Sequence, residues 1–121
     1  LPNSDRFILK GRIDKIVKIE EKRISLSELE SRLEEHQFVE KAVAVPLFNK
    51  RQMIGVALIL NKLGREHFKE HSKKYINDFW REHLLNYFEP IVLPRKWRYV
   101  DRLPVNAQGK LLLNEVKELF T

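Results

Sequence analysis

The spacing of the apolar residues changes from strand-like to helical near residue 26, and this change constrains the fold more than any other feature. Residues 13–24 have the pattern of two short strands around a tight turn. Leucines then recur at i, i+3 and i+7, which predicts a helix near residues 27–36. Ser27, with Glu30 three residues later, matches a capping box at the start of that helix. The chain therefore combines strands and helices.

Strand-like and helical spacing of the apolar residues continue to alternate toward the C-terminus. Residues 38–47 and 52–60 are apolar and β-branched and predict a hairpin, with Pro46 closing its first strand. Gly55 indicates a bulge or a close contact in the second strand. The remaining predicted elements are a helix over residues 64–88 that stops at Pro90, a strand over 97–100, a loop over 103–109 and a terminal helix over 111–120.

These elements predict an α+β domain with a small antiparallel or mixed β-sheet, flanked by helices and preceded by a β-hairpin. At 121 residues, one domain with a modest core is the expected organisation. The proportions of 43% hydrophobic and 33% charged residues argue against a disordered or fibrous chain.

Composition also excludes several kinds of chemistry. The chain has no cysteine, which excludes disulfides, thiolate catalysis and cysteine-ligated metals within it. Its apolar runs, such as residues 56–60, are of strand length and too short to cross a membrane. No secretory signal pattern is present, so we expect a protein of the reducing cytoplasm without a membrane span.

The net charge of +6 raises the question of a polyanionic partner. The basic excess lies at both ends of the chain and in residues 46–62, without a run of five like charges. The basic tip at residues 49–51 supports one alternative function, a free-standing basic α+β module that binds nucleic acid. No nucleic-acid motif accompanies it, so we expect no nucleic-acid partner.

Several other residue patterns have simpler explanations. His67 and His71 share i,i+4 spacing, but Phe68 stands where a zinc-protease helix needs glutamate, so we expect solvated histidines and no metal site. Phe79 and Trp80 fit a buried helical stripe better than a base-stacking surface. Neither a Ser/His/Asp order nor a Walker-type loop is present. Glu28, Glu30, Glu34 and Glu35 are expected to form a capping box and a solvated face.

Two segments are harder to explain as structure alone. The first begins with GRIDKIVK at residues 11–18 and continues through Arg23-Ile24 to ELE at residues 28–30. The second is LPRKWRYVDRLPVNAQGK at residues 93–110. It places Lys110 on a loop bounded by proline and glycine, from which a mobile ammonium can reach a phosphate or a carboxylate.

Together, in this order, the two segments resemble the C-terminal domain of the adenylate-forming enzymes: acyl- and aryl-CoA synthetases, peptide-synthetase adenylation domains and luciferases. The family pattern Gly-Arg-x-Asp-x-x-(Ile/Val)-Lys fits residues 11–18. The later pattern of Pro-Arg, an aromatic-Val-Asp-x-Leu-Pro strand end and Gly-Lys fits residues 94–110. The resemblance extends from about Arg6 to Phe120.

The resemblance implies a mobile C-terminal lid domain of an ATP-dependent acyl- or aryl-acid ligase. The whole enzyme would convert a carboxylate and ATP to acyl-AMP and pyrophosphate, and would then transfer the acyl group to a pantetheine thiol of CoA or a carrier protein. Its partner would be a large N-terminal adenylation domain that is not in this sequence. We therefore expect the segment alone to be inactive and to bind neither ATP with Mg²⁺ nor CoA.

The resemblance also implies roles for individual residues. Lys110 would be the catalytic lysine that contacts ATP phosphate and the substrate carboxylate during adenylation. Asp14 would be the hinge about which the domain rotates, and the rotation would present the face near residues 18–24 for thioester formation. The nucleotide- or thiol-carrier-binding positions would be Arg12, Lys18, Arg23 and Gly109.

One departure from the family pattern affects the acceptor. Glu21 stands where the family usually has glycine, in a turn along the pantetheine passage. Glutamate is bulkier and negative, which leaves open whether the acceptor is CoA or a carrier protein. The implied organisation is an N-terminal hairpin and hinge (residues 6–24), an α+β body (25–102), and a lysine loop with a terminal helix (103–121).

Overall fold

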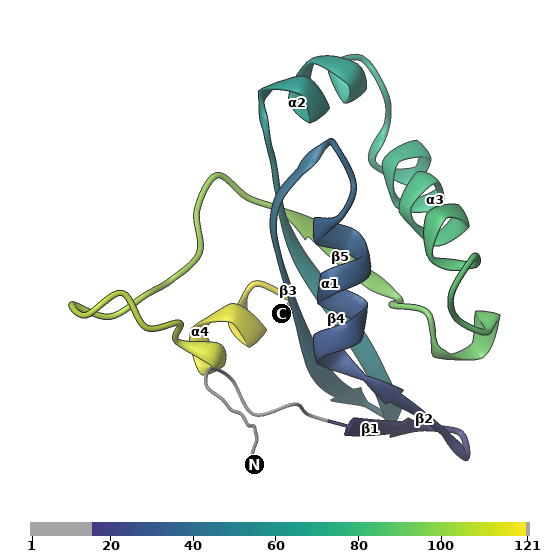
Figure 1. The fold of residues 1–121 in the computed structure, drawn as a ribbon. Coiled ribbons are helices and arrows are strands. Elements are labelled where there is room, and N and C mark those ends of the chain that lie inside the picture. The colour runs from purple at the N-terminus through teal and green to yellow at the C-terminus, as the bar shows by residue number, and fades with distance from the viewer. Residues whose placement is uncertain (1–15, 121) are drawn as a thin grey trace, which may run out of the picture.

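The computed structural model describes residues 16–120 (Figure 1). The first part of the expected N-terminal hairpin and hinge (residues 6–15), which includes Arg12 and Asp14, lies outside the described residues. The elements, in chain order, are β1 (Ile16–Ile19), β2 (Lys22–Ser25), α1 (Leu26–Glu34), β3 (Val39–Asn49), β4 (Arg51–Leu60), α2 (Lys62–Phe68), α3 (Lys73–Leu84), the 3₁₀ helix η1 (Pro90–Val92), β5 (Lys96–Tyr99) and α4 (Leu113–Glu118).

The strands form a two-stranded ribbon and a three-stranded mixed sheet. In the ribbon, β1 pairs with β2 in antiparallel orientation. In the sheet, of order β3-β4-β5, β4 is antiparallel to β3 and parallel to β5. The parallel pairing is possible because α2, α3 and η1 provide the long crossover that parallel neighbours need. The predicted α+β class and mixed sheet are confirmed.

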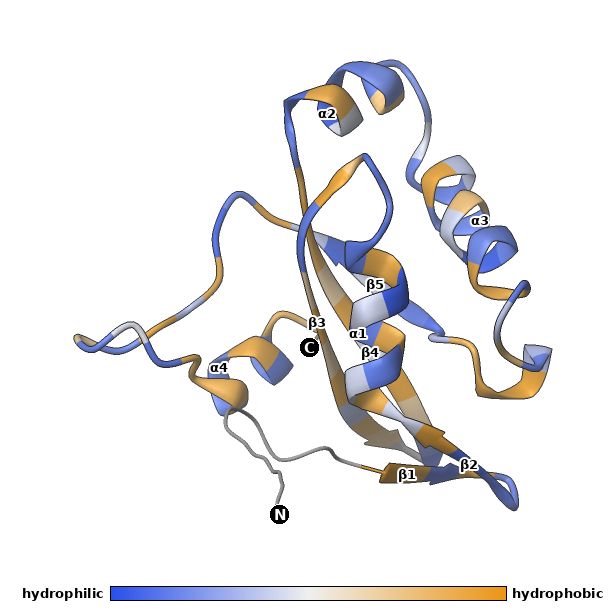
Figure 2. Cartoon of the chain, in the orientation of Figure 1, coloured by the Kyte–Doolittle hydropathy of each residue, from blue (hydrophilic) through white to orange (hydrophobic). Residues whose placement is uncertain are grey.

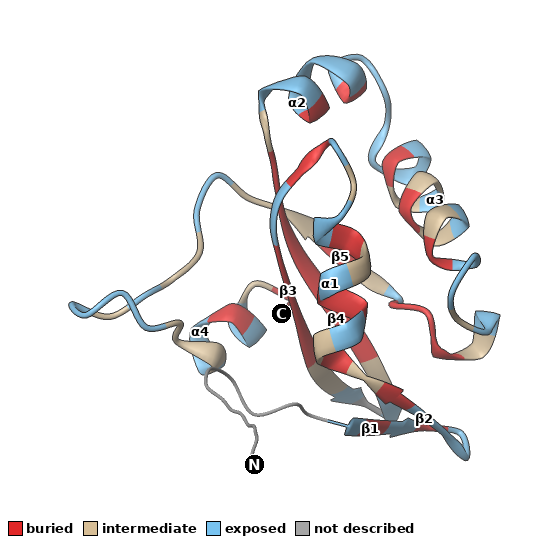
Figure 3. Cartoon of the chain, viewed as in Figure 1, coloured by how far each residue is buried: buried red, intermediate tan, exposed pale blue. Residues whose placement is uncertain are grey.

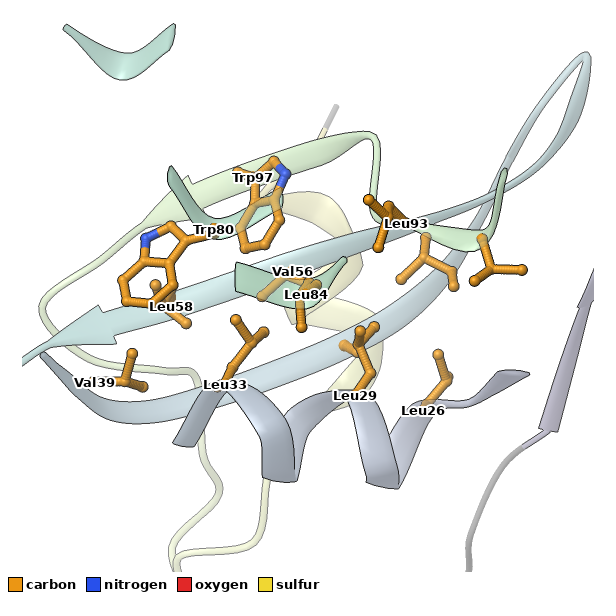
Figure 4. Packing of buried hydrophobic residues seen from close by; sticks show 14 of the residues in the cluster. Leu26, Leu29, Leu33, Val39, Val56, Leu58, Trp80, Leu84, Leu93 and Trp97 are labelled. Carbon is orange, nitrogen blue, oxygen red and sulfur yellow. The ribbon is translucent and has the colours of Figure 1, made fainter. Parts of the chain in front are cut away.

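Helices cover both faces of the sheet, so β4 is buried along most of its length (Figure 3). Helices α1 and α3 pack on one face, and Figure 4 shows the side chains of α1 pointing toward β4. Helix α4 packs on the other face. The first cluster includes Leu29, Leu33, Leu58, Trp80 and Leu84, and the second consists of Val43, Val45, Ala57, Val116 and Phe120.

Apolar residues lie mostly on the inward sides of the helices and along the strands (Figure 2). Trp80 is fully buried and Phe79 is partly buried against the same cluster, which confirms the prediction that these two aromatic residues belong to the core. A Cβ at Gly55 would lie 2.9 Å from Cε1 of Phe120, which confirms the predicted close contact. Within residues 16–120, no helix is both long and apolar enough to cross a membrane.

The prediction that Pro46 closes its strand is wrong, because β3 continues through Pro46, which pairs with Ile54 of β4. The strand is at the edge of the sheet, where proline is tolerated because its missing N–H would point away from the ladder. Ala42 and Ala44 precede Pro46 at intervals of two residues, so their backbone N–H groups also point away from β4. These N–H groups donate to carboxylates of α1. The outward edge of β3 is therefore closed by side chains and by proline.

The predicted capping box is shifted. Ser25, not Ser27, is the N-cap of α1, and its hydroxyl accepts a hydrogen bond from the N–H of Glu28 at 3.1 Å. The prediction that Glu30 belongs to a solvated face is wrong. Glu30 is only 5% exposed, and its carboxylate accepts a hydrogen bond from the N–H of Ala44 at 2.8 Å. A carboxylate is accommodated there because it meets an outward-facing backbone donor of the edge strand.

The predicted helix over residues 64–88 is two helices, α2 and α3. The break occurs because the Ser72 hydroxyl caps α3 by accepting from the N–H of Tyr75 at 3.1 Å. Pro90 does not stop the helix, since α3 already ends at Leu84. His71 lies beyond the end of α2, so the expected pair of histidines on one helix does not form.

Candidate functional site

The segment that carries Lys110 is a small hairpin, not an open loop. An isolated bridge pairs Val105 with Leu111. The N–H of Leu112 donates to the carbonyl of Pro104 at 3.0 Å, and the N–H of Asn106 donates to the carbonyl of Lys110 at 2.9 Å. These bonds close the segment over residues 104–112, which we call the lysine hairpin.

The tip of the lysine hairpin is a tight turn from Asn106 to Gly109. The N–H of Gly109 donates to the carbonyl of Asn106 at 2.9 Å, and Gly109 has a φ of 82°. Asparagine first, glycine last and a positive φ at that glycine are typical of a type I turn followed by a bulge. Glycine is needed there for its backbone conformation, since a Cβ would meet no other atom within 4 Å.

The Asn106 side chain binds the turn from the inside. Its Oδ1 accepts from the N–H of Gln108 and from the N–H of Lys110, each at 2.9 Å. Lys110 itself is exposed, and no carboxylate within residues 16–120 forms an ion pair with it. The arrangement is an unpaired ammonium on an ordered backbone, which suits a positive charge presented to an anionic group.

The β1–β2 turn has an unusual backbone for its sequence. Glu20 and Glu21 connect the paired residues Ile19 and Lys22, and their φ angles are 46° and 78°. Two positive φ values define a type I′ turn, which favours asparagine and glycine. This conformation explains physically why glycine suits the position of Glu21. The Glu20 carboxylate accepts from the guanidinium of Arg51 at 3.2 Å and ties the turn to β4.

Lys18 and Arg23 are directly opposite each other on the ribbon. Both are exposed, whereas their neighbours Val17 and Ile24 are buried, so the outer face of the ribbon is basic. Like charges directly across a strand pair repel each other. An anion held between them would relieve that repulsion, so this pair is suited chemically to a phosphate or a carboxylate.

The structure does not bring the predicted site residues together in one pocket. The lysine hairpin projects from one side of the molecule, and the β1–β2 turn, with Lys18, Glu21 and Arg23, lies at the opposite side (Figure 1). Lys110 and Gly109 form one cluster and the ribbon forms another. Arg12 and Asp14 cannot be assigned to either, because they precede residue 16.

A polar groove lies beside α3. It is lined by His36 and by residues of α3 that include Asp78, Glu82 and His83. Within residues 16–120, no group of three histidine or acidic side chains has the arrangement of a metal site. Burial, with smaller contributions from His83 and His67, lowers the pKa of His36 below its ordinary value. His67 stacks on Phe38, with ring centroids 4.6 Å apart.

Comparison with known proteins places this geometry in context. No protein-family model matches the chain. It is 27% identical over 116 residues to the D-alanine--D-alanyl carrier protein ligase of Staphylococcus aureus (strain JH9), which covers 95% of this chain and 23% of that protein.

Solved structures share the fold. An acyl-CoA synthetase of Brucella canis superposes with a TM-score of 0.71 at 20% identity, covering 90% of this chain and 19% of its own. A double mutant of the o-succinylbenzoate CoA synthetase of Bacillus subtilis superposes with a TM-score of 0.64 at 25% identity, covering 90% and 21%.

In sequence and in fold, the chain therefore matches the C-terminal domain of adenylate-forming acyl- and aryl-CoA synthetases. By their names, these relatives are a carrier protein ligase and CoA synthetases. The chain spans about a quarter of the length of the curated relatives it matches, at 23% of the first of them.

Asn106 is not among the site residues predicted from the sequence, although its side chain binds the turn that carries Lys110. The signal was present, because asparagine three positions before glycine favours a turn in which the side chain binds the following backbone. The structure adds that one of the bound N–H groups belongs to Lys110.

Proposed function

We propose that this chain is the mobile C-terminal domain of an ATP-dependent acyl- or aryl-acid ligase. In the first half-reaction a carboxylate oxygen attacks the α-phosphorus of ATP, the bond to pyrophosphate breaks, and acyl-AMP forms. In the second, a pantetheine thiol loses its proton and attacks the acyl carbon, and AMP leaves. The large N-terminal domain of the same protein would hold ATP with Mg²⁺ and the acid.

The observation that carries this proposal is the exposed ammonium of Lys110, which has no ion-pair partner within residues 16–120 and stands on a hairpin with an ordered backbone. Negative charge on the α-phosphate and the departing pyrophosphate is redistributed as the displacement proceeds. A cation placed against it in advance stabilises the transition state without reorganising at the moment of reaction. Lys110 would supply that cation when the domain closes on the active site.

The second half-reaction would use the opposite side of the domain. Rotation about a hinge near Asp14 would withdraw Lys110 and bring the ribbon face to the active site, a form of gating by a residue remote from the chemistry. The opposed cations Lys18 and Arg23 would then face the phosphate of the incoming pantetheine arm. The separation of the lysine hairpin from the ribbon supports this use of two faces (Figure 1).

The acceptor is a pantetheine thiol of CoA or of a carrier protein, and Glu21 bears on the choice. Its exposed carboxylate lies at the tip of the turn that would border the pantetheine passage. The S. aureus relative is a carrier protein ligase by name, which supports a carrier protein. The reducing cytoplasm, where free thiols persist, is the compartment that such a reaction requires.

The test uses the full-length enzyme that contains these residues, assayed for exchange of pyrophosphate into ATP in the presence of its acid. Lys110→Ala should lower the exchange rate about 100-fold or more, the scale seen when a charge-stabilising donor is removed. Lys117→Ala, the same change at an exposed position of α4, should leave it within about twofold. Equal rates for Lys110→Ala and the unmodified enzyme would contradict the proposal.

A further inference from the structure

We infer that Asn106 is a positioning residue, whose side-chain amide holds the backbone of Lys110 where its ammonium reaches the reacting phosphate. This inference rests on the proposed function of Lys110 and goes one step beyond it. Asn106 would touch neither substrate nor nucleotide and would act through the lysine alone.

The contacts that carry the inference converge on the backbone of one residue, Lys110. The N–H of Lys110 donates to Oδ1 of Asn106, and the carbonyl of Lys110 accepts from the N–H of Asn106, each at 2.9 Å. Both polar groups of the Lys110 backbone are therefore bound to a single residue. The second bond to Oδ1, from the N–H of Gln108 at 2.9 Å, fixes the other side of the turn.

The backbone of Lys110 matters because its side chain has no ion-pair partner among residues 16–120. Its side chain is exposed, makes no ion pair there, and is a flexible stem with many rotamers. The position of the ammonium is thus set by the position and direction of the Cα–Cβ bond. An error of about 1 Å in a catalytic group can cost about 100-fold in rate, so a loosened turn should lower the rate of adenylation.

A general structural role is a weaker explanation for Asn106. The residue is half-buried and belongs to neither hydrophobic cluster. The flanking contacts of the hairpin, the Val105–Leu111 bridge and the bond between Leu112 and Pro104, do not involve its side chain. Removal of the amide should therefore loosen the tip of the hairpin and leave the domain folded.

The experiment compares Asn106→Ala, Asn106→Asp and Lys110→Ala in the full-length enzyme. Asn106→Ala should lower kcat for adenylation about tenfold or more, with KM for ATP within about twofold, because the fraction of correctly placed lysine falls while ATP binding remains. Thioester formation from supplied acyl-adenylate should stay within about twofold. Asn106→Asp keeps an acceptor oxygen for both N–H groups and should restore most of the kcat.

A matched control and a physical readout accompany the kinetics. Asn114→Ala makes the same change at an exposed position of α4 and should leave both half-reactions unchanged. Amide hydrogen exchange should show faster exchange for the peptide that contains residues 106–110 in Asn106→Ala. The peptide that contains α4 should be unaffected.

The outcomes separate this inference from the proposed function. If Lys110→Ala abolishes adenylation while Asn106→Ala stays within twofold of the unmodified enzyme, the positioning role is overturned and the role of Lys110 stands. Equal losses of Asn106→Ala in both half-reactions would also overturn it, because they would indicate damage to the whole domain. Full adenylation by Lys110→Ala would overturn the proposed function itself.

Discussion

At the scale of single residues, backbone conformation determines which side chains the two turns tolerate. Gly109 occupies its positive φ without strain, whereas Glu20 and Glu21 adopt positive φ values with side chains that disfavour them. The bond between the Glu20 carboxylate and Arg51 helps to hold that turn. Glu21 makes no ion pair within residues 16–120, so no such contact offsets the strain of its positive φ.

Replacing Glu21 with glycine should therefore stabilise the domain. Relief of the left-handed conformation contributes about 1–2 kcal/mol, and the larger backbone entropy lost by glycine on folding offsets part of it, so we expect a net gain of about 0.5–1 kcal/mol in the free energy of unfolding. Urea unfolding followed by tryptophan fluorescence measures this. Glu40→Gly is the control, because Glu40 is exposed and lacks a positive φ, and it should destabilise. The same sign for both variants would refute this explanation.

At the scale of elements, the contact between α1 and the edge of β3 depends on two carboxylates. Glu30 and Glu34 lie one turn apart and accept from the N–H groups of Ala44 and Ala42, which are two residues apart on the strand. The two periods match because one helical turn and two strand residues advance by similar distances. The bond of Glu30 is buried, whereas Glu34 is more exposed and also pairs with Lys41 at 3.7 Å.

Glu30→Ala should be far more destabilising than Glu34→Ala. Loss of the Glu30 carboxylate leaves the buried N–H of Ala44 without this acceptor and should lower the free energy of unfolding by about 3 kcal/mol. Glu34→Ala should cost less than about 1 kcal/mol, because water can replace an exposed carboxylate. Chemical denaturation of the two variants provides the comparison. Equal losses would show that burial of Glu30 is not what gives its bond its strength.

The loop between α1 and β3 makes stability depend on pH. His36 accepts a hydrogen bond at Nδ1 from the N–H of Phe38 at 3.1 Å, and burial, His83 and His67 lower its pKa below the ordinary 6.5. Below about pH 6.5 the unfolded chain binds a proton at this residue more readily than the folded chain does. Stability from His36 is therefore complete above that pH and declines as the pH falls.

His36→Asn should make the free energy of unfolding less sensitive to pH between 7.5 and 5. Urea unfolding at a series of pH values measures this slope for the variant and the unmodified chain. His71→Asn is the matched control, because it makes the same change at an exposed position. If His36→Asn keeps the full slope, the dependence arises from other groups.

At the scale of the whole molecule, local sequence patterns predicted which helices and strands are present better than they predicted where each one begins and ends. The leucine spacing of α1, the apolar run of β4 and the strand near Trp97 depend on side chains whose burial follows from period alone. The break at Ser72 and the continuation of β3 through Pro46 depend on tertiary contacts that no local window contains. Serine often caps a helix and proline often ends a strand. Whether Ser72 and Pro46 act in this way is decided by the fold.

The candidate site was predictable to a similar degree. The motif predicts Lys110 and Gly109 as site residues, which stays a prediction, and the structure adds the hairpin that orders their backbone. The opposition of Lys18 and Arg23 follows from strand register and was not visible in the sequence. The separation of the two clusters could not be predicted either, because it depends on how α4 and the ribbon pack around the sheet (Figure 1).

If opposite sides of this domain serve different half-reactions, variants of the two sides should fail in different steps of the full-length enzyme. Lys110→Ala and the double variant Lys18→Ala/Arg23→Ala would each be assayed for adenylation and for thioester formation from supplied acyl-adenylate. We expect Lys110→Ala to lose adenylation alone and the double variant to lose thioester formation alone. Loss of the same half-reaction by both variants would contradict the claim.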